Sequence, residues 1–162
     1  MANPKALKAL QIRPAKESDI QHLVVLEEEC FDAYYYSHYQ FGEVDFYGYL
    51  QMKEAILVVA TCNSSLIGYV AGSVRFSRLE VVAQLDSIAV SPAFRGKGVG
   101  DRLLHCFIEE TKDRACKRVL LQVATDNNNG IAFFSRRGFQ KIRYLPGYYG
   151  KRWDGVLMEL KI

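Results

Sequence analysis

The spacing of apolar residues along the chain predicts an alternation of helices and strands. Residues 10–13 have the apolar pattern of a short strand, which Pro14 ends. Apolar positions recur at helical spacing over about 17–31 and, more weakly, over 44–52. Three runs rich in apolar and β-branched residues then predict strands, at 55–62, 66–76 and 81–90.

The second half of the chain alternates strand and helix. Its clearest pattern is a helix at 98–114, whose apolar residues lie on one face. A strand is expected at 119–124, a short helix at 127–137 that Gly138 ends, and final strands at 139–144 and 156–160. This order predicts an α/β (α+β mixed) fold with a mixed, mostly antiparallel sheet of about six or seven strands and helices on both faces.

Composition narrows the class of protein. A length of 162 residues, with 49% apolar and 24% charged residues and no repeat or linker, favours a single domain over 1–162. The net charge of +3 is too small to indicate a nucleic-acid partner. The chain shows neither a membrane-spanning apolar run nor a signal-peptide core. The four cysteines form no Cys-x-x-Cys pair and have no histidine at metal-ligand spacing, so we expect reduced thiols, a cytoplasmic location and no metal.

A glycine-rich loop opens the predicted helix at 98–114. Its residues are Arg95-Gly96-Lys97-Gly98-Val99-Gly100. Backbone N–H groups free of side chains, at the positive end of a helix dipole, bind phosphate. The loop is not a P-loop, because Lys97 lies between glycines and no Ser or Thr follows it. It is not a dinucleotide fingerprint either, because Asp101 or Leu103 stands where the third glycine is needed.

Four fragments in order resemble the GNAT superfamily of N-acyltransferases. The loop, as Arg95-x-x-Gly98-x-Gly100 after residues 88–92, is similar to that family's acyl-CoA-binding motif. Asn127 with residues 130–134, and then residues 137–139, resemble its N-x-x-A…Y-x-x-x-G-F segment, and residues 12–15 resemble its opening. The resemblance covers nearly the whole chain and favours the ribosomal-protein-alanine and protein N-terminal acetyltransferases.

The resemblance implies a sheet splayed between its fourth and fifth strands, with acetyl-CoA as co-substrate in the gap. Backbone groups on the fourth strand would pair with the pantetheine, the loop would hold the pyrophosphate, and Asn127 would bind the pantetheine arm. The amine would attack the thioester directly, without a metal, and backbone N–H groups would stabilise the oxyanion. The expected acetyl-CoA residues are Ile88, Ala89, Val90, Arg95, Gly96, Lys97, Gly98, Val99, Gly100, Asp101, Asn127 and Phe134.

The chain departs from the family at its usual acid and base positions. Phe134 stands where the acid tyrosine is expected, and Gln122 and Gln84 stand at two positions where relatives carry a glutamate base. Asp86 is the ionisable group left on the strand at 81–90, which carries Gln84. By the two-residue period it lies on the same face as Gln84 and Ile88. It is either the base, acting through a water, or a structural carboxylate. The candidate acids are Tyr144, Tyr148 and Tyr149, with packing or substrate contact as the alternative.

The end of the chain bears on the acceptor. Residues 147–158, which contain Tyr148 and Tyr149, resemble the Y-Y…D-A-x-x-M ending of protein N-terminal acetyltransferases, whose tyrosines contact the substrate backbone. This favours a protein N-terminal amine; a small-molecule amine and a non-catalytic acyl-CoA-binding regulatory domain remain alternatives. We expect a monomer or homodimer with no nucleic-acid or membrane partner. The expected substrate-binding residues are Tyr35, Gln84, Gln122, Tyr148 and Tyr149.

Overall fold

One seven-stranded sheet organises the chain, in the order β1-β2-β3-β4-β5-β7-β6. The structure is a computed structural model and describes residues 9–31 and 40–162. All neighbouring strands are antiparallel except β4 and β5, so the predicted mixed, mostly antiparallel sheet is confirmed. The strands are β1 (Leu10–Pro14), β2 (Ala55–Cys62), β3 (Ser65–Phe76), β4 (Val81–Val90), β5 (Arg118–Ala124), β6 (Gln140–Leu145) and β7 (Gly155–Lys161).

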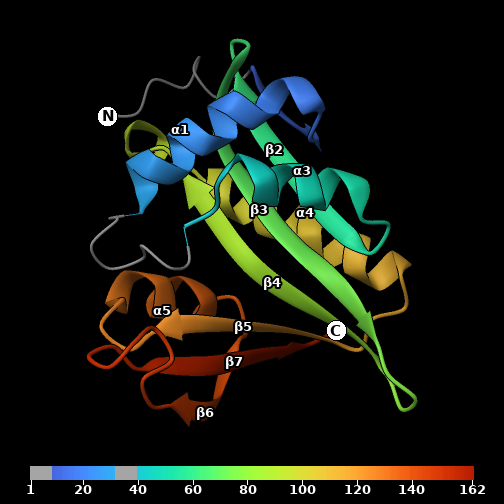
Figure 1. Cartoon of the computed structure of the whole chain (residues 1–162), viewed down its shortest axis with the longest axis vertical. Coiled ribbons are helices and arrows are strands. Elements are labelled where there is room, and N and C mark those ends of the chain that lie inside the picture. Colours follow the sequence, from blue (N-terminus) through green and yellow to red (C-terminus); the bar gives the residue numbers. More distant parts are fainter. Residues whose placement is uncertain (1–8, 32–39) are drawn as a thin grey trace.

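Helices cover both faces of the sheet (Figure 1). Two of them, α1 and α3, pack on one face of β2–β4, and α4 packs on the other. Strand β2 is a continuous apolar run because it is buried on both sides. The helical segments are η1 (Glu17–Asp19), α1 (Ile20–Cys30), α3 (Glu43–Gln51), η2 (Pro92–Phe94), α4 (Val99–Asp113) and α5 (Asn128–Ser135).

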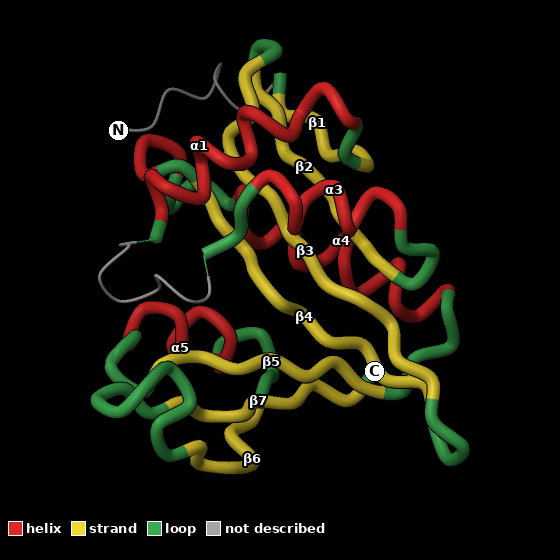
Figure 2. The backbone as a smooth tube through the Cα atoms, in the orientation of Figure 1, coloured by secondary structure: helices red, strands yellow, loops and turns green. Residues whose placement is uncertain are grey.

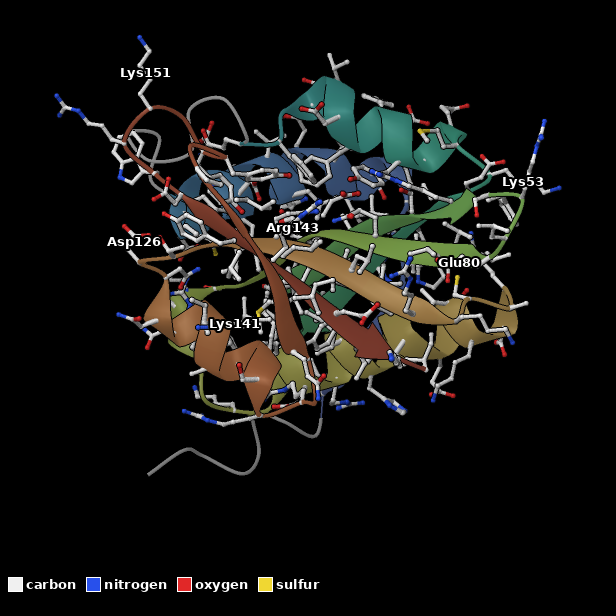
Figure 3. All side chains as sticks on the ribbon, turned by 90° about the horizontal axis from the view of Figure 1, so that it is seen from below. Lys53, Glu80, Asp126, Lys141, Arg143 and Lys151 are labelled. Atoms are coloured by element: carbon white, nitrogen blue, oxygen red, sulfur yellow. The ribbon has the colours of Figure 1, made fainter. Side chains whose placement is uncertain are left out.

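The parallel strands β4 and β5 form a wedge. They pair only where Val82–Gln84 lies beside Arg118–Leu120, and beyond that point they diverge (Figure 2). The paired end is closed by ion pairs from Arg118 to Glu80 and to Glu159, the latter at 2.9 Å. Figure 3 marks the two ends, with Glu80 at the paired end and Asp126, which follows β5, at the diverging end.

A β-bulge interrupts β4 inside the wedge. Ala71 pairs with Ser87 while its neighbour Gly72 pairs with Leu85, so Asp86 is an extra residue without a partner in β3. The extra residue reverses the alternation of side chains beyond it. Ile88 therefore packs with the core on the α4 side, whereas Asp86 contacts α3 on the opposite face. The prediction that Ile88 shares a face with Asp86 is wrong, because the two-residue period does not continue across the bulge.

Two further findings concern the described residues. No helix among residues 9–31 and 40–162 is long and apolar enough to cross a membrane. All four cysteines are free thiols, with Cys62 and Cys116 buried and Cys30 and Cys106 partly buried.

We expect Gly72→Ala to destabilise the protein strongly. An added Cβ would lie 2.3 Å from the Gln84 carbonyl oxygen and 2.6 Å from the Phe107 ring of α4, so the bulge and α4 cannot both keep their places. Overpacking of this kind lowers the unfolding free energy by up to about 3 kcal/mol. Urea denaturation followed by circular dichroism measures the change.

The matched control is Gly48→Ala in α3. An added Cβ at Gly48 meets no atom within 4 Å, so alanine should raise the unfolding free energy. The expected gain is about 0.5–1 kcal/mol, the difference in helix propensity between the two residues. Equal losses for both variants would show that close packing at the bulge is not the cause.

Candidate functional site

Two cavities meet in the wedge between β4 and β5. The larger, about 690 Å³, lies between the start of α4 and α5, and the smaller, about 340 Å³, lies between α1, α3 and the loop that joins β6 to β7. They are adjacent, because four of the described residues line both: Phe31, Ile88, Asn127 and Phe134. The site is therefore continuous across the sheet, with two chemically different ends.

The larger cavity contains an anion cradle at the start of α4. The first helical hydrogen bond runs from the Arg102 N–H to the Gly98 carbonyl at 3.2 Å. The N–H groups of Val99, Gly100 and Asp101 therefore precede the helical ladder, and all three residues line the cavity. Such N–H groups, with the helix dipole behind them, suit a phosphate.

Backbone conformation explains two of the loop glycines. Gly96 and Gly98 have φ of 71° and 79°, in the left-handed region that residues with a Cβ rarely adopt. Arg95 lines the cavity, and its Nε donates to the Val90 carbonyl at 2.9 Å. Lys97 does not line it, because its Nζ donates to the Ala93 carbonyl at 2.8 Å.

Two arginines of the larger cavity were not among the predicted residues. Arg137 donates from Nε to the Asp101 carboxylate at 2.6 Å, and its guanidinium lies 3.6 Å from the centre of the Phe133 ring. Arg136 lines the same cavity. The ion pair of Arg137 with Asp101 ties the segment after α5 to the start of α4, and Arg136 adds a positive charge to the lining of the cavity. Arg137 belongs to a fragment that resembles a family motif, so the sequence did mark this position. The motif does not show which residue Arg137 contacts.

Asn127 and Phe134 stand where the two cavities join. The Asn127 Oδ1 accepts from the Gly130 N–H at 2.9 Å and so caps α5, which leaves its amide nitrogen for other partners. Phe134 is 7% exposed and packs edge-on against Phe133 and Phe139. The predicted residues Ile88, Ala89 and Val90 line the larger cavity along β4.

A carboxylate and a phenol form one wall of the smaller cavity. The Tyr49 hydroxyl, from α3, donates to Asp86 Oδ2 at 2.7 Å. Asp86 keeps contact with solvent, but the protein atoms around it displace water and raise the pKa of its carboxyl group. The hydrogen bond from Tyr49 and the charge of Arg75 act in the opposite direction. Burial and the neighbouring carboxylate raise the pKa of Tyr49 far above its ordinary value.

A second carboxyl group, Glu27 of α1, also lines this cavity. It is 2% exposed and accepts from the Phe41 N–H at 3.0 Å and from the Tyr69 hydroxyl, which lies 2.8 Å from Ser87 Oγ. Burial raises the pKa of Glu27, and these two donors oppose the rise. Sequence reasoning missed it, although a glutamate four residues after the buried Leu23 interrupts an apolar helix face.

The tyrosines predicted near the acceptor are placed differently from one another. Tyr148 and Tyr149 line the smaller cavity, with ring centres 4.9 Å apart. Tyr144 lines neither cavity; its hydroxyl donates to Asp154, and its ring lies in a separate groove along β6. Asp154 also accepts from the Gly147 N–H at 2.6 Å, which orders the loop that carries Tyr148. Tyr35 lies outside the described residues.

The two glutamines are in direct contact at the point where the strands part. Gln122 lines the smaller cavity, and Gln84 is buried beneath it. The Gln84 Nε2 donates to Gln122 Oε1 at 2.8 Å. Among the residues that the structure describes, no group of three or more His, Cys, Asp or Glu side chains is arranged to hold a metal ion.

Comparison with known proteins agrees with this geometry. The family model for the Acetyltransferase (GNAT) family matches residues 20–139. An uncharacterized N-acetyltransferase of Methanocaldococcus jannaschii is 30% identical over 148 residues, which cover 88% of this chain and 66% of the relative. N-alpha-acetyltransferase 60 of Danio rerio is 29% identical over 174 residues, covering 95% and 68%. The chain thus spans about two thirds of the length of these relatives.

The fold also matches solved structures. Arabidopsis thaliana NAA60 in complex with acetyl-CoA superposes with a TM-score of 0.82, over 94% of this chain and 98% of that one. The sequence identity is 20%, so this match concerns the fold.

Asn127 tests the junction of the cavities. Asn127→Asp keeps an oxygen for the Gly130 N–H but loses the side-chain N–H₂, so it should keep its stability while coenzyme A binds about tenfold more weakly. Asn127→Ala should lose the same affinity and, with the cap, about 1 kcal/mol of unfolding free energy. Isothermal titration calorimetry and urea denaturation separate the two effects. An unchanged affinity for coenzyme A in both variants would show that Asn127 does not contact the coenzyme.

Proposed function

The chain belongs to the acetyltransferase (GNAT) family, and we propose that it transfers the acetyl group of acetyl-CoA to the α-amine of a polypeptide N-terminus. The observation that carries this proposal is the junction of the two cavities in the β4–β5 wedge. The larger cavity has the N–H groups and arginines that a pyrophosphate needs. The smaller has a carboxylate and tyrosines suited to an amine.

Acetyl-CoA fits the larger cavity in a definite direction. The pyrophosphate is held by the N–H groups at the start of α4, with Arg95 and Arg137 beside it. The pantetheine lies along β4 from Val90 to Ile88 and passes Asn127 and Phe134. The thioester then reaches the junction, where the smaller cavity begins.

A polypeptide N-terminus is supported by three observations. One of the relatives is named an N-alpha-acetyltransferase. Tyr148 and Tyr149, on the loop that resembles the substrate loop of such enzymes, line the smaller cavity. An α-amine has a pKa of about 8 against about 10.4 for lysine, so near neutral pH it is unprotonated more often by a factor on the order of 10². A site with few bases favours that amine.

The chemistry is a direct acyl transfer. The amine nitrogen attacks the thioester carbon, so that the N–C bond forms and the carbonyl oxygen becomes an oxyanion; the C–S bond then breaks as the carbonyl re-forms and the thiolate leaves. Asp86 accepts the amine proton, directly or through a water, because it is the carboxylate of this wall that keeps contact with solvent. The thiolate takes a proton from Tyr148 or from water. Backbone N–H groups of β4 stabilise the oxyanion.

A cytoplasmic location accompanies this proposal. All four cysteines are free thiols, as expected in a reducing compartment. Protein N-termini and acetyl-CoA are both available there.

Free-thiol release from acetyl-CoA tests the function. The substrate is a peptide with a free N-terminus, and the matched control is the same peptide with a blocked N-terminus and one lysine. We expect release with the first and little with the second. Release with the lysine alone contradicts an α-amine acceptor. Binding of coenzyme A without release for any amine favours the regulatory-domain alternative, which Gln122 and Phe134 at the usual base and acid positions would suit.

The role of Asp86 is tested by its pH dependence. Asp86→Asn should lower kcat/KM by about 10²-fold or more and remove the low-pH inflection that reports the base. Tyr49→Phe removes a hydrogen bond that lowers the pKa of Asp86. The pKa of the base then rises, so the inflection should move to higher pH while activity is retained above it. An inflection that stays in place in Tyr49→Phe would exclude Asp86 as the base.

A further inference from the structure

The orientation of the Gln122 side chain is set by the backbone of β4. Gln84 is 5% exposed, and its Nε2 donates both to the Leu85 carbonyl at 3.1 Å and to Gln122 Oε1 at 2.8 Å. A carbonyl only accepts hydrogen bonds, so the Gln84 amide must turn its nitrogen toward it. That nitrogen then requires the oxygen of Gln122. If the Gln84 amide were turned the other way, its oxygen would face both the Leu85 carbonyl oxygen and Gln122 Oε1.

The consequence is a hydrogen-bond donor on the β5 wall of the smaller cavity. With Oε1 bound to Gln84, the Nε2 group of Gln122 has no hydrogen-bond partner among the described residues, while Gln122 lines the cavity. A donor held at the edge of a partly buried site binds an acceptor oxygen in preference to remaining unpaired. A glutamate at this position would present only acceptors.

The opposite wall has the complementary character. Asp86, on β4, presents a carboxylate that accepts hydrogen bonds. An amine between the walls can donate to Asp86, and an oxygen near that amine can accept from Gln122. The matching ligand is an amine whose neighbouring carbon bears a carbonyl group, which describes the first residue of a peptide.

We propose that Gln122, oriented by Gln84, binds the carbonyl oxygen next to the acceptor amine and so selects α-amino carbonyl compounds over simple amines. This proposal rests on the proposed acetyltransferase function and names the chemical feature that its acceptor must carry. Lysine side chains and alkylamines have no carbonyl within reach of Gln122 while their amine contacts Asp86. They leave the amide unpaired, and a site built around a hydrogen bond rejects such analogues.

The test compares two acceptors that differ in one group. L-alanine amide has a carboxamide where isopropylamine has a methyl group, and rates are expressed per unprotonated amine so that the different degrees of protonation do not enter. With wild-type protein, we expect kcat/KM to favour alanine amide by about tenfold or more. Gln122→Met keeps the length of the side chain but has no donor. It should lower the ratio about tenfold, through a higher KM for alanine amide.

Two further variants keep the result interpretable. Gln122→Glu replaces the donor by an acceptor, so it should also lose the preference for alanine amide. Gln84→Met frees the Gln122 amide to turn, so it should lower the ratio of the two kcat/KM values by less than Gln122→Met does. Gln140→Met is the control, because Gln140 is exposed on β6 and lines neither cavity. Coenzyme A binding by each variant reports that its fold is intact.

The outcomes distinguish this proposal from the function on which it rests. A ratio that is the same in wild type, Gln122→Met and Gln122→Glu, with both amines acetylated, overturns the role of Gln122 and leaves the acetyltransferase function standing. No thiol release from wild type with either amine or with any peptide overturns the function itself. A ratio that falls in the Gln122 and Gln84 variants and not in Gln140→Met supports the proposal.

Discussion

The parting of two parallel strands is the constraint on which the site depends. Strands β4 and β5 pair over Val82–Gln84 and Arg118–Leu120, and beyond that no β4–β5 pairing continues among the described residues. Their inner edges therefore carry backbone groups that need partners from elsewhere. The ion pairs of Arg118 hold the strands together at one end, while Asn127 and Phe134 lie between the cavities at the other. In the proposed complex, the extended pantetheine arm of acetyl-CoA supplies the pairing that the sheet leaves out.

The bulge at Asp86 determines which groups face the acceptor side of this wedge. Without the extra residue, alternate side chains would continue along β4, and Asp86 and Ser87 would point to opposite faces. With it, Asp86 meets Tyr49 of α3, Ser87 meets the buried Tyr69, and both line the smaller cavity. The absence of a side chain at Gly72 permits this geometry, because the Gln84 carbonyl and Phe107 occupy the space. A backbone irregularity thus arranges the groups to which we assign the proton chemistry.

The sequence predicted the succession of helices and strands along the chain and the glycine-rich loop before α4, because both depend on local patterns. Apolar periodicity identified the helices and strands, and the glycines at 96 and 98 marked positions where the backbone needs positive φ. The acceptor side depends on contacts between distant segments. Nothing in the pattern distinguishes Tyr49 from the other tyrosines of its segment, and the bulge has no sequence signature that would place Ile88 on the far face. The Gln84–Gln122 contact likewise joins two strands whose relative register only the fold supplies.

The two cavities draw on different parts of the chain. The larger is built mainly from 88–101 and 127–137, whereas the smaller takes much of its wall from α1, α3 and the loop before β7. Within the part of the chain that the structure describes, only four residues belong to both. Under the proposed function, substitutions in α1, α3 and the loop before β7 can therefore change the acceptor without disturbing the binding of the acetyl donor. In evolutionary terms, residues 88–101 and 127–137 would remain under one constant selection while the segments that line only the smaller cavity diverge. A single duplicated gene can in this way give rise to paralogues that share a donor and differ in their acceptors.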